Sequence, residues 1–236
     1  TPLYSSAASD VYKRQPFVNK ELTKTDRNGK NFGKIASIVN WGSNRENLIS
    51  RKILETTCDV HRDASLPEFQ KETFVKKQKN APPTINTQAP AYGRKAVIYA
   101  TCFVNYNNPS IGFAAQAVLN LNGVTTEVVY PSCCGMPQLE QGNIQEVARS
   151  AEKVAKELRS WVDDGNDIIA LTPSCALMLK FEWPLILPEN EDVRALSGAT
   201  FDIDEYVVAI AKKEGLADGL KSLDGGVTLH LSLIHI

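Results

Sequence analysis

From residue 93 onward, short apolar runs alternate with longer segments of helical periodicity. The runs predict strands that are buried on both faces, because almost every position in them is apolar. They lie at residues 96–100 (AVIYA), 125–130 (TTEVVY) and 167–171 (DIIAL). Strands that alternate with helices in this way predict an α/β fold, with a parallel sheet in a Rossmann-like β-α-β-α-β order.

The segments between these runs predict the helices. The first begins at Asn108 and Pro109, residue types favoured at an N-cap and at the first helical position, and it ends at Gly123. A second, long helix is predicted at residues 137–164. A third is predicted at residues 175–183, because the proline that follows disfavours a continuing helix.

Residues 16–92 are more polar and predict a mostly helical or irregular arm that precedes the regular domain. One helix is expected to start near Asn44, where apolar residues follow at spacings of three and four. A proline-rich linker at residues 76–93 ends the arm. The first regular domain is therefore expected at residues 93–185.

Residues 186–231 predict connecting helices, one of them at 203–214, and then a strand at 227–231 (VTLHL) that begins a second, truncated domain. The two ends of the sequence have a different character. Residues 1–15 (TPLYSSAASDVYKRQ) and 232–236 (SLIHI) resemble translated sequencing-adapter read-through, so we expect non-native tails and a fragment of a longer protein. A disordered start and a frayed apolar end are the alternative.

Composition narrows the classes of function. The formal net charge of the 236 residues is −1, so no basic field favours nucleic acid or an anionic membrane surface. No apolar run reaches the roughly 18 residues that a membrane-spanning helix needs, and no signal peptide is evident. An odd number of cysteines, five, argues against a secreted disulfide scaffold and for a reducing, cytoplasmic location.

Four of the five cysteines follow predicted strands. Cys102 comes two residues after the first strand, Cys133 and Cys134 come three and four residues after the second, and Cys175 comes four residues after the third. The carboxyl ends of parallel strands share one edge of the sheet, which is where open α/β sheets bind ligands. We therefore predict that these four thiols converge, with unrelated buried cysteines as the alternative.

Four thiolates suit a [4Fe–4S] cluster or a tetrahedral zinc ion, and spacing alone does not decide between them. A vicinal disulfide between Cys133 and Cys134 is a third possibility. Helices that begin at this edge would lower the thiol pKa values, and Gly135 would leave room for a bulky ligand. The asparagines within residues 105–108 either donate hydrogen bonds to cluster sulfurs or act as turn residues. Cys58 is expected to be an ordinary apolar cysteine away from the others.

The combination of Cys102, a CCG triplet at residues 133–135 and a PSC triplet at 173–175 resembles the CCG domain of cysteine-rich iron–sulfur oxidoreductases. Such domains occur in one subunit of heterodisulfide reductase and in one subunit of anaerobic glycerol-3-phosphate dehydrogenase. The phrase PSCALMLKFEWP at residues 173–184 is similar to the second group in particular. The polar stretch at residues 39–74 also resembles the region that joins a ferredoxin-like domain to the CCG domains there.

The resemblance implies an iron–sulfur electron-transfer subunit in which Cys102, Cys133, Cys134 and Cys175 bind the cofactor, a [4Fe–4S] cluster being expected. It also implies two CCG domains in tandem, often after a ferredoxin domain, whereas this sequence has neither the ferredoxin cysteines nor a second CCG triplet. The fuller family pattern has a fifth cysteine where this chain has Met178. A four-thiolate cubane or a zinc ion therefore fits this inventory better than a five-cysteine double cluster, with a ligand donated by the other half of the protein as the alternative.

The resemblance further implies redox partners. We expect electrons from a flavoprotein dehydrogenase or another redox subunit to pass to a quinone or another acceptor, with peripheral association with the cytoplasmic membrane through those partners. The sequence has no P-loop, no G-x-G-x-x-G motif and no Ser-His-Asp arrangement, so the chain alone is expected to be inactive. A non-catalytic scaffold that binds zinc or a cluster is the alternative.

Overall fold

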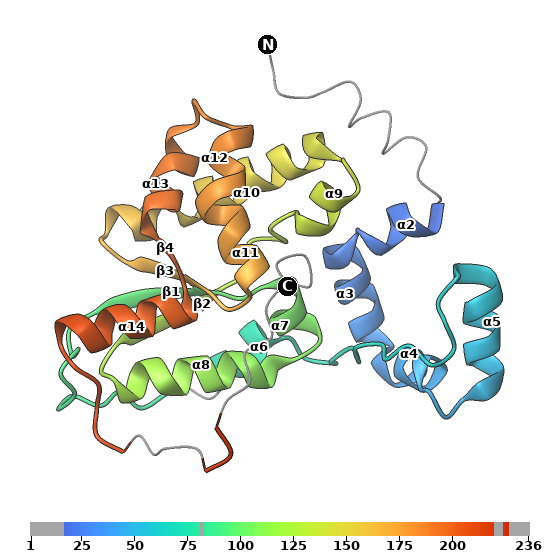
Figure 1. The fold of residues 1–236 in the computed structure, drawn as a ribbon, viewed down its shortest axis with the longest axis horizontal. Coiled ribbons are helices and arrows are strands. Elements are labelled where there is room, and N and C mark those ends of the chain that lie inside the picture. Colours follow the sequence, from blue (N-terminus) through green and yellow to red (C-terminus); the bar gives the residue numbers. More distant parts are fainter. Residues whose placement is uncertain (1–16, 81–82, 220–223, 227–236) are drawn as a thin grey trace.

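The computed structural model describes residues 17–80, 83–219 and 224–226. Its centre is a four-stranded, all-parallel sheet in the order β2-β1-β3-β4, which confirms the predicted α/β fold (Figure 1). The strand predicted at 227–231 and both foreign-looking tails lie outside the described residues. The four strands are β1 (Lys95–Tyr99), β2 (Thr125–Val129), β3 (Asp167–Ala170) and β4 (Thr200–Asp202).

β1 and β3 are the two central strands, and their side chains are buried on both faces of the sheet. In the register, Val97 of β1 stands beside Glu127 of β2 and beside Ile168 of β3. β2 is an edge strand, and its exposed positions include Glu127. The continuous apolar runs thus mark the central strands, as expected for a parallel sheet covered by helices.

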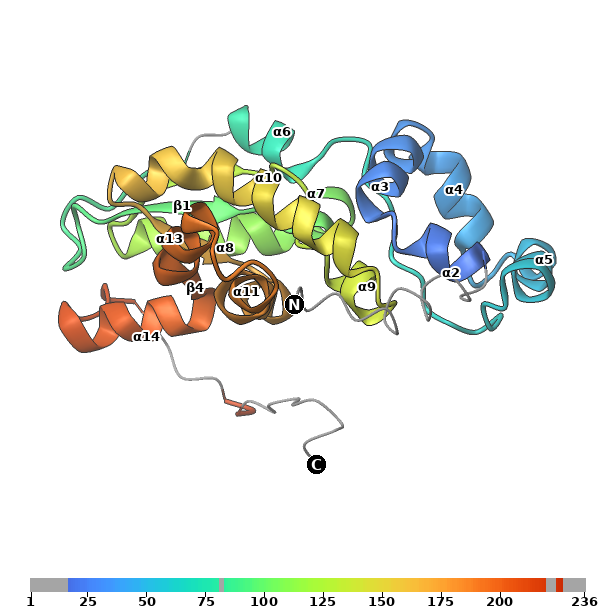
Figure 2. The same cartoon turned by 90° about the horizontal axis from the view of Figure 1, so that it is seen from above.

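Helices cover both faces of the sheet, as the two views show (Figures 1 and 2). Successive side chains of a strand point to opposite faces. Val97 and Tyr99 join the core under α10 (Ile144–Asp163) and α13 (Glu191–Ala199). Ile98 joins the opposite core, under α8 (Pro109–Leu121) and α14 (Ile203–Lys213).

The long helix predicted at residues 137–164 is two helices, α9 (Met136–Glu140) and α10. Gly142 separates them with a φ of +78°, a left-handed conformation that ends an α-helix. Asn143 then caps α10, because its side chain accepts a hydrogen bond from the backbone N–H of Glu146. The apolar periodicity runs across this break and therefore concealed it.

The third predicted helix does not stop before Pro184. It consists of α11 (Pro173–Leu177), a π-helical segment η1 (Met178–Glu182) and α12 (Trp183–Ile186). Proline is tolerated in the first turn of a helix, and the π-helical turn already interrupts the α-helical hydrogen bonds before it. α13 falls within residues 186–231, where connecting helices were predicted, whereas the short elements α7 (Cys102–Tyr106) and β4 were not predicted.

The arm is helical, as predicted, and lies at one end of the sheet domain (Figure 1). The helix expected near Asn44 begins later, where Asn47 accepts a hydrogen bond from the backbone N–H of Ser50. The last arm helix joins the domain core through Phe74, which is fully buried. The arm helices are α2 (Phe17–Leu22), α3 (Thr25–Lys34), α4 (Ala36–Ser43), α5 (Leu48–Cys58) and α6 (Phe74–Lys79).

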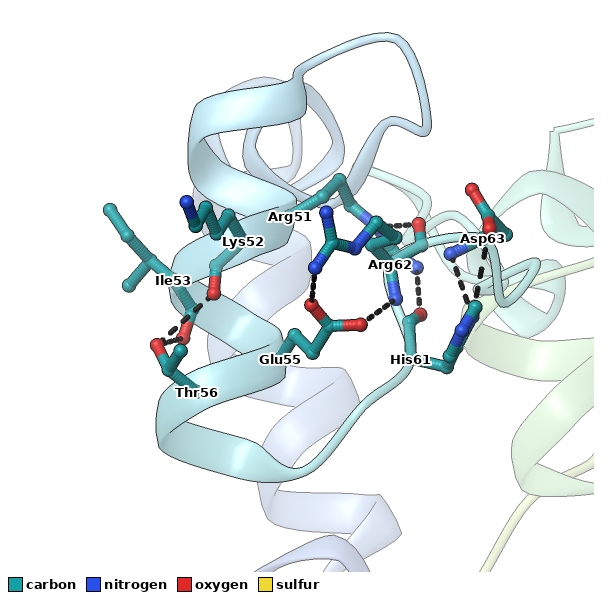
Figure 3. A network of polar contacts seen from close by, with 8 residues as sticks. All are labelled: Arg51, Lys52, Ile53, Glu55, Thr56, His61, Arg62 and Asp63. Carbon is teal, nitrogen blue, oxygen red and sulfur yellow. Dashed lines mark hydrogen bonds and ion pairs between the residues drawn. The ribbon is translucent and has the colours of Figure 1, made fainter.

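A buried arginine holds the outer part of the arm together. The guanidinium of Arg51 donates hydrogen bonds to the carbonyl oxygens of Ser43 (3.2 Å), Arg62 (2.8 Å), His61 (2.9 Å) and Ala64 (2.7 Å). Figure 3 shows the hydrogen bonds to Arg62 and His61 beside the ion pair between Arg62 and Glu55. The charge of a fully buried arginine is thus satisfied by main-chain oxygens, most of them in the following loop.

Candidate metal centre

The four cysteines predicted to converge lie together at the carboxyl edge of the sheet. Cys102 opens α7 after β1, Cys133 and Cys134 lie in the loop after β2, and Cys175 lies in α11 after β3. The Sγ atoms of Cys102 and Cys133, which we call the outer pair, are 3.7 Å apart. Those of Cys134 and Cys175, the inner pair, are 3.2 Å apart.

The two pairs form one largely buried group. The thiols of Cys133 and Cys134 also interact with each other, which joins the outer pair to the inner pair. Cys133, Cys134 and Cys175 are 3%, 2% and 5% exposed, and Cys102 is half-buried. All five cysteines are free thiols, so the vicinal disulfide considered for Cys133 and Cys134 is not formed.

Two buried aromatic side chains fix the loop that carries the cysteine pair. Tyr99 of β1 donates its hydroxyl to the carbonyl oxygen of Ser132 at 2.6 Å. Trp183 of α12 donates its indole N–H to the carbonyl oxygen of Cys134 at 3.0 Å. Both aromatic residues are fully buried, so the main chain on either side of Cys133 is anchored to the domain core.

Comparison with known proteins supports the site. Residues 96–180, which include all four convergent cysteines, match the family model of the cysteine-rich domain named CCG. This part of the chain is similar to the CCG domain. The finding confirms the resemblance that the cysteine pattern indicated.

The chain is homologous to two kinds of curated protein. It is 27% identical over 180 residues to a subunit of the anaerobic glycerol-3-phosphate dehydrogenase of Escherichia coli, a match that covers 75% of this chain and 43% of the relative. It is 28% identical over 145 residues to lactate utilization protein A of Bacillus pumilus, covering 58% of this chain and 57% of the relative. The chain thus spans less than two thirds of the length of either relative. No solved structure matches it significantly.

Gly135, the glycine of the CCG triplet, is required by the backbone rather than by the space for a ligand. It has a φ of +85° and directly precedes α9. A Cβ atom at this position would lie 3.4 Å from the Cα atom of Val147, which is ordinary contact. A side chain would therefore fit, but it would strain the left-handed conformation.

The domain that matches the CCG family also contacts the arm at this edge, through residues that no sequence pattern marked. The backbone N–H of Cys133 donates to Oδ2 of Asp26 at 2.9 Å, and the hydroxyl of Tyr130 donates to Oδ1. Burial raises the pKa of Asp26, and these two hydrogen bonds oppose the rise. Asp26 lies in a polar segment without a motif, so only the fold reveals its place.

The four thiols do not behave alike. The pKa of Cys133 is well below the ordinary thiol value, mainly because of its hydrogen bonds with the thiols of Cys102 and Cys134. The same hydrogen bonds, with burial, raise the pKa values of Cys102 and Cys134. Helix N-termini were expected to lower these thiol pKa values, but the net shift of Cys102 and Cys134 is upward.

Other residues singled out in the sequence have different roles. Asn105 accepts a hydrogen bond from the backbone N–H of Val75 at 3.2 Å, and Asn107 donates to the carbonyl oxygen of Glu68 at 2.9 Å. These asparagines tie the end of the arm to α7. Cys58 ends α5, which lies at the outer end of the arm, away from α7 and α11 in both views (Figures 1 and 2).

Met178, which takes the place of a fifth cysteine, is fully buried at the start of η1 and belongs to the same core cluster as Cys134 and Cys175. The donors present are thus four thiols, a set whose chemistry fits an iron–sulfur cluster and also fits zinc. Within the described residues, no three His, Cys, Asp or Glu side chains are already spaced as ligands of a single metal ion. No helix in the described part of the chain is long and apolar enough to cross a membrane.

Proposed function

We propose that the CCG domain binds an iron–sulfur cluster through Cys102, Cys133, Cys134 and Cys175, and that the chain acts in an electron-transfer subunit of an oxidoreductase. The observation that carries this proposal is the meeting of four thiols, from three different strand ends, in one buried group. Four thiolates are the usual protein ligands of a [4Fe–4S] cluster, which is the cluster type that we propose.

The bound cluster would supply one-electron chemistry, and the residues of the chain would set its surroundings. The cysteines supply thiolates, and Cys133 already has a thiol pKa below the ordinary value. Tyr99 and Trp183 keep the loop in place through their hydrogen bonds to main-chain oxygens. Burial of three of the four thiols limits the access of water, and low exposure is one of the factors that tune a cluster potential.

The names of the relatives support a place in a dehydrogenase system. One is a subunit of an anaerobic glycerol-3-phosphate dehydrogenase, and the other is a lactate utilization protein. We propose that electrons enter from a flavoprotein dehydrogenase or another redox subunit and leave to a quinone or another acceptor. The location would be cytoplasmic, with attachment to the cytoplasmic membrane through the partner subunits.

Zinc gives the second candidate function, a non-catalytic scaffold. The observation behind it is that the site has four thiols and Met178, where the family pattern has a fifth cysteine, and four thiols also fit zinc. Four thiolates around zinc form a closed structural site that contributes folding free energy but does not transfer electrons. The two candidates therefore differ in metal content and in redox activity.

Anaerobic reconstitution of the chain with iron and sulfide separates these candidates. We expect stoichiometric iron and sulfide, together with an electron paramagnetic resonance signal that changes on reduction. Replacing any one of the four convergent cysteines by serine should lower the iron content, whereas Cys58→Ser, the matched control, should leave it unchanged. Protein that binds only zinc and gives no reducible signal would refute the electron-transfer proposal.

A further inference from the structure

One side of the cysteine site is formed by helix α3 of the arm, which lies outside the residues that match the CCG family. We call this helix the arm wall of the site. Helix α3 lies beside α7 in both views (Figures 1 and 2). A Cβ atom on Gly29 of α3 would lie too close to the ring atom Cδ2 of Tyr106 in α7 and would clash with it. The close packing of the two helices therefore needs a glycine at this position. The arm is also tied to α9, because Gln138 donates to the carbonyl oxygen of Thr23 at 2.7 Å.

The carboxyl group of Asp26 binds the loop between β2 and the CCG triplet at two points. One oxygen accepts from the backbone N–H of Cys133 at 2.9 Å, and the other accepts from the hydroxyl of Tyr130. The N–H of Cys133 is therefore held by the arm. Because both donors belong to one short loop, the carboxyl group fixes the direction in which this loop leaves the sheet.

Thr25, the neighbour of Asp26, faces the same sulfur atoms. Its hydroxyl oxygen is buried without a hydrogen-bond partner of good geometry, and it lies beside the thiols of Cys102 and Cys133. The arm thus contacts the outer pair at its thiols and at its backbone. The hydrogen bond that supports the inner pair comes instead from Trp183 of the domain itself.

We propose that α3 is part of the metal centre, with Asp26 and Thr25 as positioning residues that hold the outer pair. The proposal deepens the proposed function and rests on it only for the identity of the ligand. The effect of α3 on the thiols does not depend on any ligand. It follows that the arm adds to the hydrogen bond from Tyr99 in holding the outer pair, while the hydrogen bond that supports the inner pair comes from the domain core.

Thiol labelling of the metal-free full chain tests this division. Two variants disturb the wall in different ways: Asp26→Asn cannot accept both hydrogen bonds, and Gly29→Ala pushes α3 away from the ring of Tyr106. Asp63→Asn, at an arm residue whose side chain is 72% exposed, is the matched control. Alkylation rates of each cysteine are read by mass spectrometry of its peptide, with Cys58 as the reference for reagent activity.

We expect both wall variants to label the outer pair several-fold faster than the parent chain, with the inner pair unchanged. A general loosening or unfolding would instead accelerate both pairs together, and that result would overturn the proposal. Unchanged labelling of the outer pair in both wall variants would overturn it as well. These readouts need no cluster, so they remain decisive even if reconstitution of the parent chain fails.

The potential of the reconstituted protein gives an independent readout. Asp26→Asn removes a carboxyl group beside the outer pair and weakens its hold on the N–H of Cys133, and both changes favour the more reduced cluster. The midpoint potential should therefore shift upward relative to the parent and to Asp63→Asn. An unchanged potential in a fully loaded Asp26→Asn variant would contradict the role assigned to Asp26.

Discussion

Trp183→Phe should destabilise the fold strongly although it keeps an aromatic ring in the core. Trp183 is fully buried, and its indole N–H donates to the carbonyl oxygen of Cys134 at 3.0 Å. Phenylalanine has no N–H, so the substitution leaves that buried carbonyl oxygen without its partner. It also leaves a small cavity between α12 and the cysteine loop, because the phenyl ring is smaller than the indole ring.

The magnitude follows from these two losses. A buried acceptor left without a partner costs about 1–3 kcal/mol. Complete truncation of a buried tryptophan to alanine costs roughly 3–5 kcal/mol, so the smaller step to phenylalanine should cost about 1–2 kcal/mol. The expected loss of unfolding free energy for Trp183→Phe is therefore about 2–5 kcal/mol. This is a large share of the roughly 5–15 kcal/mol that typical domains possess.

Urea unfolding of the metal-free chain, followed by circular dichroism, measures this loss. The metal-free form is preferred, because any ligand that binds only the native state adds its own stabilisation. Trp41→Phe is the matched control, since Trp41 is 68% exposed, and its cost should stay within about 0.5 kcal/mol. If Trp183→Phe cost no more than Trp41→Phe, the hydrogen bond to Cys134 would not anchor the loop as argued.

Three further predictions concern the arm, the alkaline stability and the CCG loop. A lysine at position 51 cannot donate to all four carbonyl oxygens, so Arg51→Lys should lower the stability of the arm by about 2–4 kcal/mol. The loss should appear as faster hydrogen exchange in α4 and α5, whereas Arg45→Lys, at an exposed arginine, should leave the exchange unchanged. Burial raises the pKa of Tyr206 from 10.0 to about 12. The unfolded chain therefore loses this proton at a lower pH than the folded chain, and the free energy of unfolding falls between those pH values. Over the same range, the urea midpoint of Tyr206→Phe should fall less than that of the parent chain. Gly135→Ala should cost roughly 1–2 kcal/mol through its positive φ, whereas Gly198→Ala, in a helix and without close contacts, should be neutral or stabilising in urea unfolding.

The parallel sheet could be predicted because its central strands are continuous apolar runs. A residue in β1 or β3 faces a helix layer on either side, so both sets of alternating positions must be apolar. β4 escaped prediction because it has only three residues, and its place beside β3 depends on a pairing between distant segments. The break at Gly142 escaped because the hydrophobic pattern continues on both sides of it.

The convergence of the four cysteines could also be predicted, and for a topological reason. Parallel strands place their carboxyl ends at one edge, so a cysteine shortly after each strand must lie near the others. The structure brings Cys102 next to Cys133 and brings Cys134 next to Cys175. That these residues are the ligands of a cluster stays a prediction until metal binding is measured.

The contact of Asp26 with Cys133 could not be predicted, because 107 residues separate the two in the sequence and no periodicity relates them. It depends on how α3 packs on α7, which in turn depends on the missing side chain of Gly29. The asparagines beside Cys102 misled for the same reason, since their partners at residues 68 and 75 become visible only once the arm is folded back.

Some of the residues that hold the four thiols in place lie outside the segment that matches the CCG family. The residues that match the CCG family contain the four thiols, the cysteine loop and its anchor Tyr99, but Trp183 and Asp26 lie outside them. The matched segment therefore contains the donor atoms without two of the residues that hold them in place. A related chain that keeps the four thiols but packs a different segment against the outer pair should bind the same kind of ligand and hold it at a different potential. The thiols determine what can be bound, and the packing around them determines how the bound group behaves.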